Sequence, residues 1–316
     1  MVRTENYYMT LIACSFEGNS AHTGGGMHVE RGNYQMNITL CTYTGNFASF
    51  AAEGGALFFN DANQFVLLDS CSFVNNSAYK GGAVGLFEAN IYMLLTSCVF
   101  SHNDAQVGGG LFLFKENIGM TLTSCAFTGN TASSGGSGAF FDTDNDHVSL
   151  NLCSFEANTA LAGDGSGLYV NNANDFMTLF SCSFTHNNAE INGGGMYVHS
   201  VNEGMLITFT NFSSNTAQVY GGGLYVNTDN NNMGFEFCIF EHNSAKLHGG
   251  GMSAGSDNWD MQLTDMLFMA NVAGGDGGAL FLFFDNFYMT VINSMFHQNS
   301  AGAAGMISTT LLCNSD

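Results

Sequence analysis

The chain has 316 residues, 40 glycines and no proline, and its formal net charge is −21 because only five of its side chains are lysine or arginine. So few cations argue against nucleic-acid binding, in which lysine and arginine neutralise phosphates, and against adhesion to an anionic membrane surface. No apolar run approaches the roughly 20 residues that a membrane span needs, so we also expect no membrane insertion.

One short phrase recurs from one end of the chain to the other. A phenylalanine, or Tyr43 in the second copy, is followed three residues later by an asparagine and two residues after that by an alanine. The asparagines stand 27 to 30 residues apart and form a column of eleven: Asn19, Asn46, Asn76, Asn103, Asn130, Asn158, Asn187, Asn215, Asn243, Asn271 and Asn299. A repeat of this period is typical of a solenoid, in which each unit packs on its neighbours. We therefore predict a single domain over residues 1–316.

One repeat, taken in chain order, predicts three strands. Residues 120–123 and 125–127 alternate apolar and polar side chains, as strands do. Asn130 then turns the chain, since asparagine suits tight turns and can bond to the coils above and below. A glycine-rich corner leads to a third strand at residues 139–141, and an Asp/Asn-rich loop follows at 142–146. The predicted fold is all-β: a parallel β-helix of about eleven coils with three short strands per coil.

Two further columns of equivalent residues are expected to lie inside the coils. The first opens the first strand and is mostly methionine: Met9, Met36, Phe65, Met93, Met120, Val148, Met177, Met205, Met233, Met261 and Met289. Methionine fills irregular core space well, and no histidine or thiolate is arranged with it as a metal ligand. We therefore interpret this column as core, and expect no metal there.

The second column contains eight of the nine cysteines, each two residues before the aromatic residue of the repeat: Cys14, Cys41, Cys71, Cys98, Cys125, Cys153, Cys182 and Cys238. Disulfides between successive coils, such as Cys14–Cys41, are possible because a coil spacing of about 4.8 Å suits a disulfide. Cys182 and Cys238 would lack neighbours in such a scheme. We favour mostly free thiols, and Cys313 lies outside the column.

The repeat resembles that of the polymorphic outer-membrane protein family, in which a Gly-Gly-Ala-apolar motif accompanies Phe-x-x-Asn. The motif stands here at residues 54–57, 81–84 and 277–280. The resemblance implies a right-handed β-helix displayed outside the cell, often as an adhesin. Neither the signal peptide nor the C-terminal membrane barrel usual in bacterial members is recognisable, so a leader has been removed or this is a segment of a longer chain. We expect an extracellular or cell-surface location.

An aromatic stripe is the first candidate for a binding surface. In the third strand the second residue is expected to point outward, and five successive coils place an aromatic residue there: Phe112, Phe140, Tyr169, Tyr197 and Tyr225. An exposed aromatic stripe can mark an interaction site, for sugar rings or for another rod. Alternatively, the stacked rings only stabilise the sheet, as cross-strand pairs do, and this reading is somewhat favoured.

Acidic loops and possible glycosylation sites are the other surface candidates. Oxygen-rich loops can hold Ca²⁺, although solvated acidic turns are the favoured reading and no cofactor is expected. The loop residues concerned are Asp142, Asp144, Asp146, Asp229, Asp257, Asp260 and Asp285. Asn37, Asn75 and Asn211 match the acceptor motif for N-glycosylation.

Catalysis is not predicted. Many polysaccharide lyases and hydrolases are β-helices, but a fold alone does not supply a function. Residues 227–229, Asn-Thr-Asp, faintly resemble a pectin-hydrolase motif, whose companion carboxylates, histidine and basic residues are missing. A polysaccharide-active enzyme is thus the third hypothesis.

The leading hypothesis is a structural rod that associates end to end. The sequence contains nearly a whole number of coils and no recognisable cap, and head-to-tail contacts of one surface with another generate filaments. We therefore predict a non-enzymatic extracellular subunit of a filament or surface fibre. The alternative is an adhesin that binds glycans or other surface proteins through the aromatic stripe, and a fragment of a longer β-helix would have the same ends.

Overall fold

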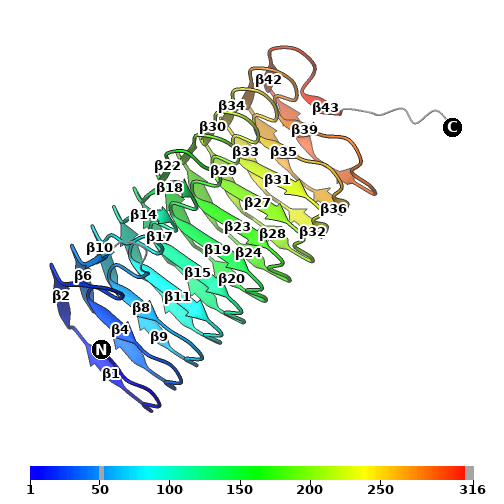
Figure 1. The fold of residues 1–316 in the computed structure, drawn as a ribbon. Coiled ribbons are helices and arrows are strands. Elements are labelled where there is room, and N and C mark those ends of the chain that lie inside the picture. The colour runs from blue at the N-terminus through cyan, green and yellow to red at the C-terminus, as the bar shows by residue number, and fades with distance from the viewer. Residues whose placement is uncertain (50–52, 310–316) are drawn as a thin grey trace.

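A computed structural model describes residues 1–49 and 53–309 of the chain. Over these residues the chain is all-β and winds into a parallel β-solenoid of eleven coils, as the repeat predicts (Figure 1). The coils follow one another along the axis in chain order, from β1 at one end to β43 at the other. None of the described segments is a helix long and apolar enough to cross a membrane.

Three parallel sheets of eleven strands run the whole length of the rod, one strand of each per coil. The first sheet contains β1 (Thr10–Ile12), β5 (Asn37–Thr39), β9 (Leu67–Asp69), β12 (Leu94–Thr96), β16 (Thr121–Thr123), β20 (Ser149–Asn151), β24 (Thr178–Phe180), β28 (Leu206–Thr208), β32 (Asn231–Glu236), β36 (Trp259–Thr264) and β40 (Thr290–Ile292). The second contains β2 (Ser15–Glu17), β6 (Thr42–Thr44), β10 (Ser72–Val74), β13 (Val99–Ser101), β17 (Ala126–Thr128), β21 (Ser154–Glu156), β25 (Ser183–Thr185), β29 (Asn211–Ser213), β33 (Ile239–Glu241), β37 (Leu267–Met269) and β41 (Met295–His297). The third contains β4 (Met27–Val29), β8 (Leu57–Phe59), β11 (Val84–Glu88), β15 (Leu111–Lys115), β19 (Ala139–Thr143), β23 (Leu168–Asn172), β27 (Met196–Ser200), β31 (Leu224–Thr228), β35 (Met252–Ala254), β39 (Leu280–Leu282) and β43 (Ile307–Thr309).

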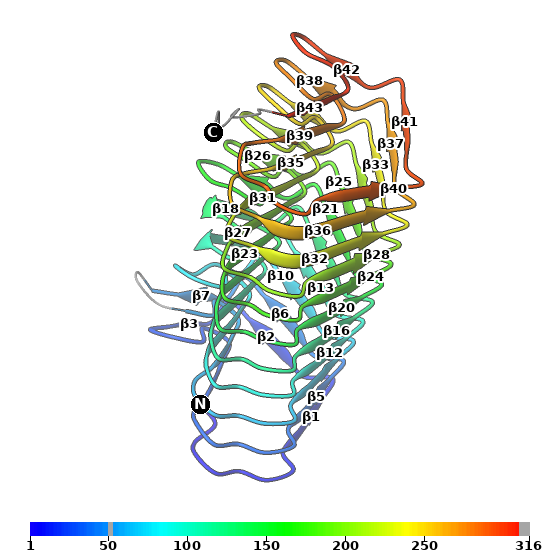
Figure 2. The same ribbon diagram turned by 90° about the vertical axis from the view of Figure 1, so that its right-hand side faces the viewer.

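A fourth, shorter strand, which was not predicted, follows the second in most coils. Eight of these strands form one sheet: β14 (Asp104–Val107), β18 (Thr131–Gly135), β22 (Thr159–Ala160), β26 (Asn188–Ala189), β30 (Thr216–Ala217), β34 (Ser244–Ala245), β38 (Val272–Ala273) and β42 (Ser300–Ala301). At the N-terminal end, β3 (Ser20–Ala21) pairs with β7 (Phe47–Ala48). In Figure 2 the short strands lie in loops that project beside the third sheet. Most are only two residues long, too short for an alternating pattern to reveal them.

Equivalent residues of successive coils stack in register, so the core is a set of columns. Phe73 pairs with Phe100, and Phe100 with Phe127. From Phe16 to Phe296 the rings lie 4.6 to 5.0 Å apart with nearly parallel planes. The interior position predicted for this column is confirmed. One member of the methionine column is corrected: Val66 is buried there, whereas Phe65 lies at the corner with φ 54° and is exposed.

The predicted asparagine column forms a hydrogen-bonded ladder. In the middle of the rod the Oδ1 atom of Asn158 accepts hydrogen bonds from the backbone N–H and the Nδ2 of Asn130, both 3.0 Å. The Nδ2 of Asn158 donates to Asn187 Oδ1 and to the carbonyl oxygen of Phe127, both at 2.9 Å. The side chain is fully buried. Each asparagine thus replaces, inside the rod, the hydrogen bonds that water would make.

A second asparagine ladder lies at the corner before the first strand, and the sequence analysis missed it. Asn117 Oδ1 accepts from both nitrogens of Asn90, at 3.1 Å. Its members are Asn6, Asn33, Asn63, Asn90, Asn117, Asn145, Asn174, Asn202, Asn230, Asn258 and Asn286. Each stands 13 residues before an asparagine of the first ladder, a spacing without exception that could have revealed it.

Glycine is required at the corner that leads into the third sheet. Gly81 has φ +61°, in the left-handed region that glycine adopts without strain. A Cβ on the next residue, Gly82, would collide with the carbonyl oxygen of Gly109 in the following coil. The first constraint accounts for a glycine at this corner in every coil. The second accounts for the Gly-Gly pair found in eight of the coils, whereas Ser137, Ser166 and Met306 follow the corner glycine in the other three.

Removal of one ladder amide should destabilise the rod strongly. In Asn158→Ala, both nitrogens of Asn130 and the carbonyl of Phe127 lose their buried partner. With about 1–3 kcal/mol for each of these three groups, we expect a loss of at least about 3 kcal/mol in the free energy of unfolding, measured as a lower urea midpoint by circular dichroism. Glu156→Ala, an exposed change in the same coil, should alter the free energy of unfolding by less than about 0.5 kcal/mol. Equal effects of the two variants would contradict the ladder's role.

Candidate functional site

The aromatic stripe exists as a stack of rings on the outer side of the third sheet. Successive ring centroids are 5.7 Å apart between Phe112 and Phe140, 4.5 Å to Tyr169, 4.7 Å to Tyr197 and 5.6 Å to Tyr225. The register of β15, β19, β23, β27 and β31 brings these residues together. The sequence therefore identified the neighbours correctly.

The prediction that this stripe is exposed is wrong. Phe112, Tyr197 and Tyr225 are only 1%, 4% and 7% exposed, and Phe140 and Tyr169 are half-buried. Burial also raises the pKa of Tyr225 to about 12. With so little accessible surface, Phe112, Tyr197 and Tyr225 cannot offer their faces to a sugar.

At two places a residue just before a corner glycine covers the stripe. Lys80 places its Nζ 4.8 Å from the centre of the Phe112 ring, and the Tyr220 ring lies 5.8 Å from that of Tyr225. At these two places the segment that leads into the third strand thus covers the outward face of the third sheet. Alternation along the strand predicts which side a residue faces, but not that another part of the coil covers that side.

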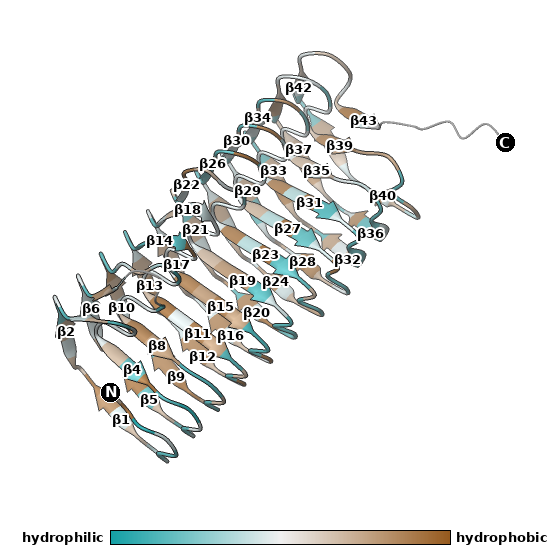
Figure 3. Cartoon of the chain, in the orientation of Figure 1, coloured by the Kyte–Doolittle hydropathy of each residue, from teal (hydrophilic) through white to brown (hydrophobic). Residues whose placement is uncertain are grey.

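The acidic loops follow the third sheet, where Figure 3 shows hydrophilic residues at the ends of β23, β27 and β31. Asp144, Asp229, Asp257 and Asp285 share one corner, each with φ between 54° and 60°. Aspartate tolerates this left-handed conformation because its short side chain bonds locally. The corner therefore accounts for these four residues structurally.

The remaining acidic residues of these loops do not converge on a common site. Asp142 Oδ1 accepts from Asn171 Nδ2 at 2.7 Å, and Asp146 Oδ1 accepts from the backbone N–H of Asp175 at 3.0 Å. Asp260 lies at the next corner with φ 51°. Among the described residues, no three histidine, cysteine or acidic side chains are grouped so that they could hold a metal ion.

The three glycosylation motifs differ in accessibility. Asn75 is exposed at a turn with φ 55°, so its amide is open to solvent. Asn37 in β5 and Asn211 in β29 are half-buried within strands, and Asn37 Oδ1 accepts a hydrogen bond from Thr39. Asn75 is therefore the most accessible of the three acceptors.

The cysteine column consists of free thiols, in agreement with the favoured interpretation. Cys41 to Cys238 are at most 2% exposed, whereas Cys14 in the first coil is half-buried. The thiols point toward carbonyl groups of the first sheet; Cys98 Sγ lies 3.4 Å from the oxygen of Leu68. Burial raises the pKa of Cys238 to about 12.

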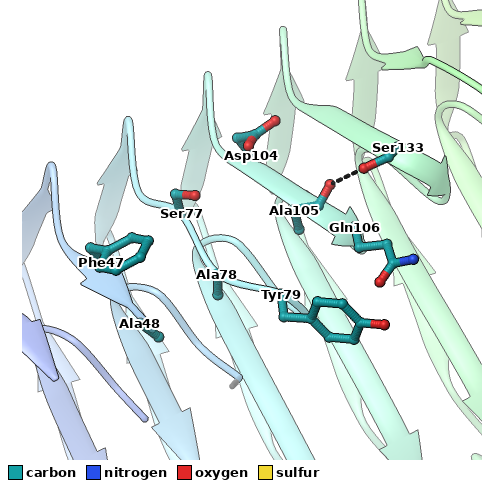
Figure 4. Close-up of a pocket in the computed structure, with 9 residues that line it drawn as sticks. All are labelled: Phe47, Ala48, Ser77, Ala78, Tyr79, Asp104, Ala105, Gln106 and Ser133. Carbon is teal, nitrogen blue, oxygen red and sulfur yellow. Dashed lines mark hydrogen bonds between the residues drawn. The ribbon is translucent and has the colours of Figure 1, made fainter. Parts of the chain in front are cut away.

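A shallow hollow of about 230 Å³ lies along the short fourth strands near the N-terminal end (Figure 4). Its lining comprises Phe47, Ala48, Ser77, Ala78, Tyr79, Asp104, Ala105, Gln106 and Ser133. Burial raises the pKa of Asp104. This lining combines hydroxyl groups with one carboxylate and contains no histidine.

A second hollow, here called the first-sheet hollow, opens on the outer face of the first sheet across β28, β32 and β36. It has a volume of about 290 Å³ and is lined by Phe176, Gly204, Met205, Leu206, Asn232, Met233, Gly234, Glu236 and Gln262. Two glycines in adjacent coils remove side chains at this place and create the depression. No sequence pattern marks this surface, because its residues come from four coils and share no repeated motif.

Comparison with known proteins reveals similarity only at the level of the fold. No protein-family model matches the chain, and no curated protein matches it in sequence. The resemblance to polymorphic outer-membrane proteins therefore stays a prediction.

Among solved structures, the chain is similar to the A-module of the mannuronan C-5 epimerase AlgE6 of Azotobacter vinelandii. The two are 11% identical, the TM-score is 0.45, and the match covers 96% of this chain and 90% of the module. Tailspike protein 3 of bacteriophage CBA120 is also similar, with 10% identity and a TM-score of 0.41. The match covers 96% of this chain and 55% of the tailspike chain, so this chain spans about half of the tailspike's length. At these levels neither protein indicates what this chain binds or does.

Burial should protect the thiols from alkylation. With its pKa raised to about 12, Cys238 should react with iodoacetamide at pH 8 about a thousandfold more slowly than a free thiol, because the thiolate is the reactive form. Peptide mapping by mass spectrometry measures this. Cys14 is the internal control and should be labelled faster; all eight cysteines of the column should react in urea. Labelling of native Cys238 as fast as Cys14 would contradict the buried thiol column.

Proposed function

We propose that the chain is a non-enzymatic structural rod located outside the cell. Copies of this rod associate end to end into a filament or fibre. The observation that carries this proposal is that the two asparagine ladders have a direction. In each ladder, hydrogen bonds run from the nitrogens of one coil to the Oδ1 of the next, so the two ends of the rod offer complementary groups.

The unpaired ladder groups lie in the first and the last coil. Asn299 Oδ1 accepts from the backbone N–H of Asn271 at 2.9 Å, but among the described residues its own backbone N–H has no acceptor. At the other end, Asn19 donates to Asn46 Oδ1, while its own Oδ1 receives no hydrogen bond from the described part of the chain. A second rod placed end to end would join these groups and continue the ladder.

The apolar columns end in the same complementary way. The Phe16 ring stacks at 4.7 Å on Tyr43, and the Phe296 ring at 5.0 Å on Phe268. Within residues 1–49 and 53–309, neither ring has a stacked ring on its other side. In the last coil, Val291 pairs with Leu263 and is 42% exposed, whereas Leu263 is fully buried. Open strand edges with exposed apolar residues favour the addition of another strand layer, and contacts of unlike ends generate open filaments.

Electron microscopy over a range of concentrations tests this proposal. We expect filaments with an axial repeat of about 53 Å, which is eleven coils at about 4.8 Å each. Sedimentation velocity should show the same assembly as a concentration-dependent increase in size.

Two matched variants at the C-terminal end identify the interface. Val291→Asp places a carboxylate where the core column of a second rod would stack, so the concentration needed for assembly should rise at least about a hundredfold. Thr290→Asp adds the same charge at the neighbouring exposed position, which faces outward, and should leave assembly nearly unchanged. Wild-type rods that stay single at every concentration would refute end-to-end association, as would equal effects of the two variants.

A further inference from the structure

We propose that the first-sheet hollow binds an uncharged carbohydrate, with one sugar ring packed against Phe176. The hollow is separate from the aromatic stripe, which is buried, and from the end faces of the rod. Its two sides differ in chemistry: one is an exposed aromatic and aliphatic wall, and the other carries amides and a carboxylate.

The apolar wall is formed by Phe176 and Leu206. Phe176 is 49% exposed and Leu206 is 39% exposed. A Cβ on Gly204 would lie 2.7 Å from the Phe176 ring, and one on Gly234 would lie 2.9 Å from Leu206. Both side chains therefore lie flat over the glycine of the following coil and present a broad apolar surface. The C–H face of a pyranose ring is apolar and packs well against an aromatic face.

The polar side is formed by Asn232, Glu236 and Gln262, which are all exposed. The side chains of Asn232 and Glu236 make no hydrogen bond to any described residue. Gln262 donates from Nε2 to Asp260 Oδ1 at 3.1 Å, which leaves its carbonyl oxygen available. Two amides and a carboxylate offer both donors and acceptors, as the hydroxyl groups on the rim of a sugar ring require.

Charge and size select the class of ligand. No lysine or arginine lines the hollow, and Glu236 would repel an anionic sugar, so an uncharged glycan fits better than a uronate, sulfate or phosphate ester. The volume of about 290 Å³ is at the small end for ligand clefts and suits one ring of a glycan. A protein partner fits the hollow less well, because a stable protein interface would need more than about 1,000 Å² of buried surface.

Affinity electrophoresis of the full chain tests the proposal, with dextran, mannan, xylan and laminarin as neutral probes and alginate and polygalacturonate as anionic ones. At least one neutral polysaccharide should retard the wild-type chain. Phe176→Ala and Gly234→Thr should each weaken this binding at least tenfold, the first by removing the ring and the second by displacing Leu206 from the apolar wall. Thr178 occupies the equivalent position two coils earlier, so the coil accommodates threonine there.

Phe209→Ala is the matched control. Phe209 is 54% exposed at the corner beyond the hollow, so its removal should change binding less than twofold. The circular dichroism of all variants should match that of the wild type. The proposal is overturned if no neutral polysaccharide retards the chain, if only the anionic ones or a protein partner bind, or if Phe176→Ala and Gly234→Thr bind like the control.

Discussion

The hydrogen bonding of buried asparagine amides along the axis is the constraint on which the rest of this structure depends. An amide in a dry interior must find both donors and acceptors, and in each ladder the partner is the same residue one coil further on. A coil therefore fits only if it brings its asparagines to the same two places as its neighbours. The stacked rings and the free thiols follow from this register.

The consequence is visible in where the coils differ in length. From the third sheet through the second ladder to the first ladder, the spacing never changes; Leu57 stands six residues before Asn63, as Val84 does before Asn90. Between the first ladder and the third sheet it varies: Leu57 follows Asn46 by eleven residues, and Val84 follows Asn76 by eight. All variation thus falls in the loop between the first ladder and the third sheet, which also provides Lys80 and Tyr220 beside the aromatic stripe. This loop tolerates insertions because it carries no ladder amide.

The parts of the structure that the sequence predicts are those that repeat. The Phe-x-x-Asn spacing was sufficient to predict the fold, the eleven coils, the core rings and the first ladder. The second ladder was overlooked because its asparagines stand among Asp, Ala and Glu residues that resemble an ordinary polar loop. The burial of Tyr225 depends on its contact with Tyr220, which precedes the corner glycine of the same coil, and the hollow beside Phe176 depends on glycines in two different coils. Neither feature leaves a periodic signal in the sequence, so both become visible only in the folded structure.

The ladders also determine how such a rod would carry load. Tension along the axis acts on the coils in series, and adjacent coils are joined by nearly the same set of bonds, such as those between Asn130 and Asn158. Coils would then detach one at a time at similar forces, beginning at the ends, where a coil has a single neighbour. Each detached coil releases about 28 residues of slack, or roughly 90–100 Å when extended. The rod would be stiff under small loads and highly extensible under large ones, which suits a tether that must absorb a pull without breaking.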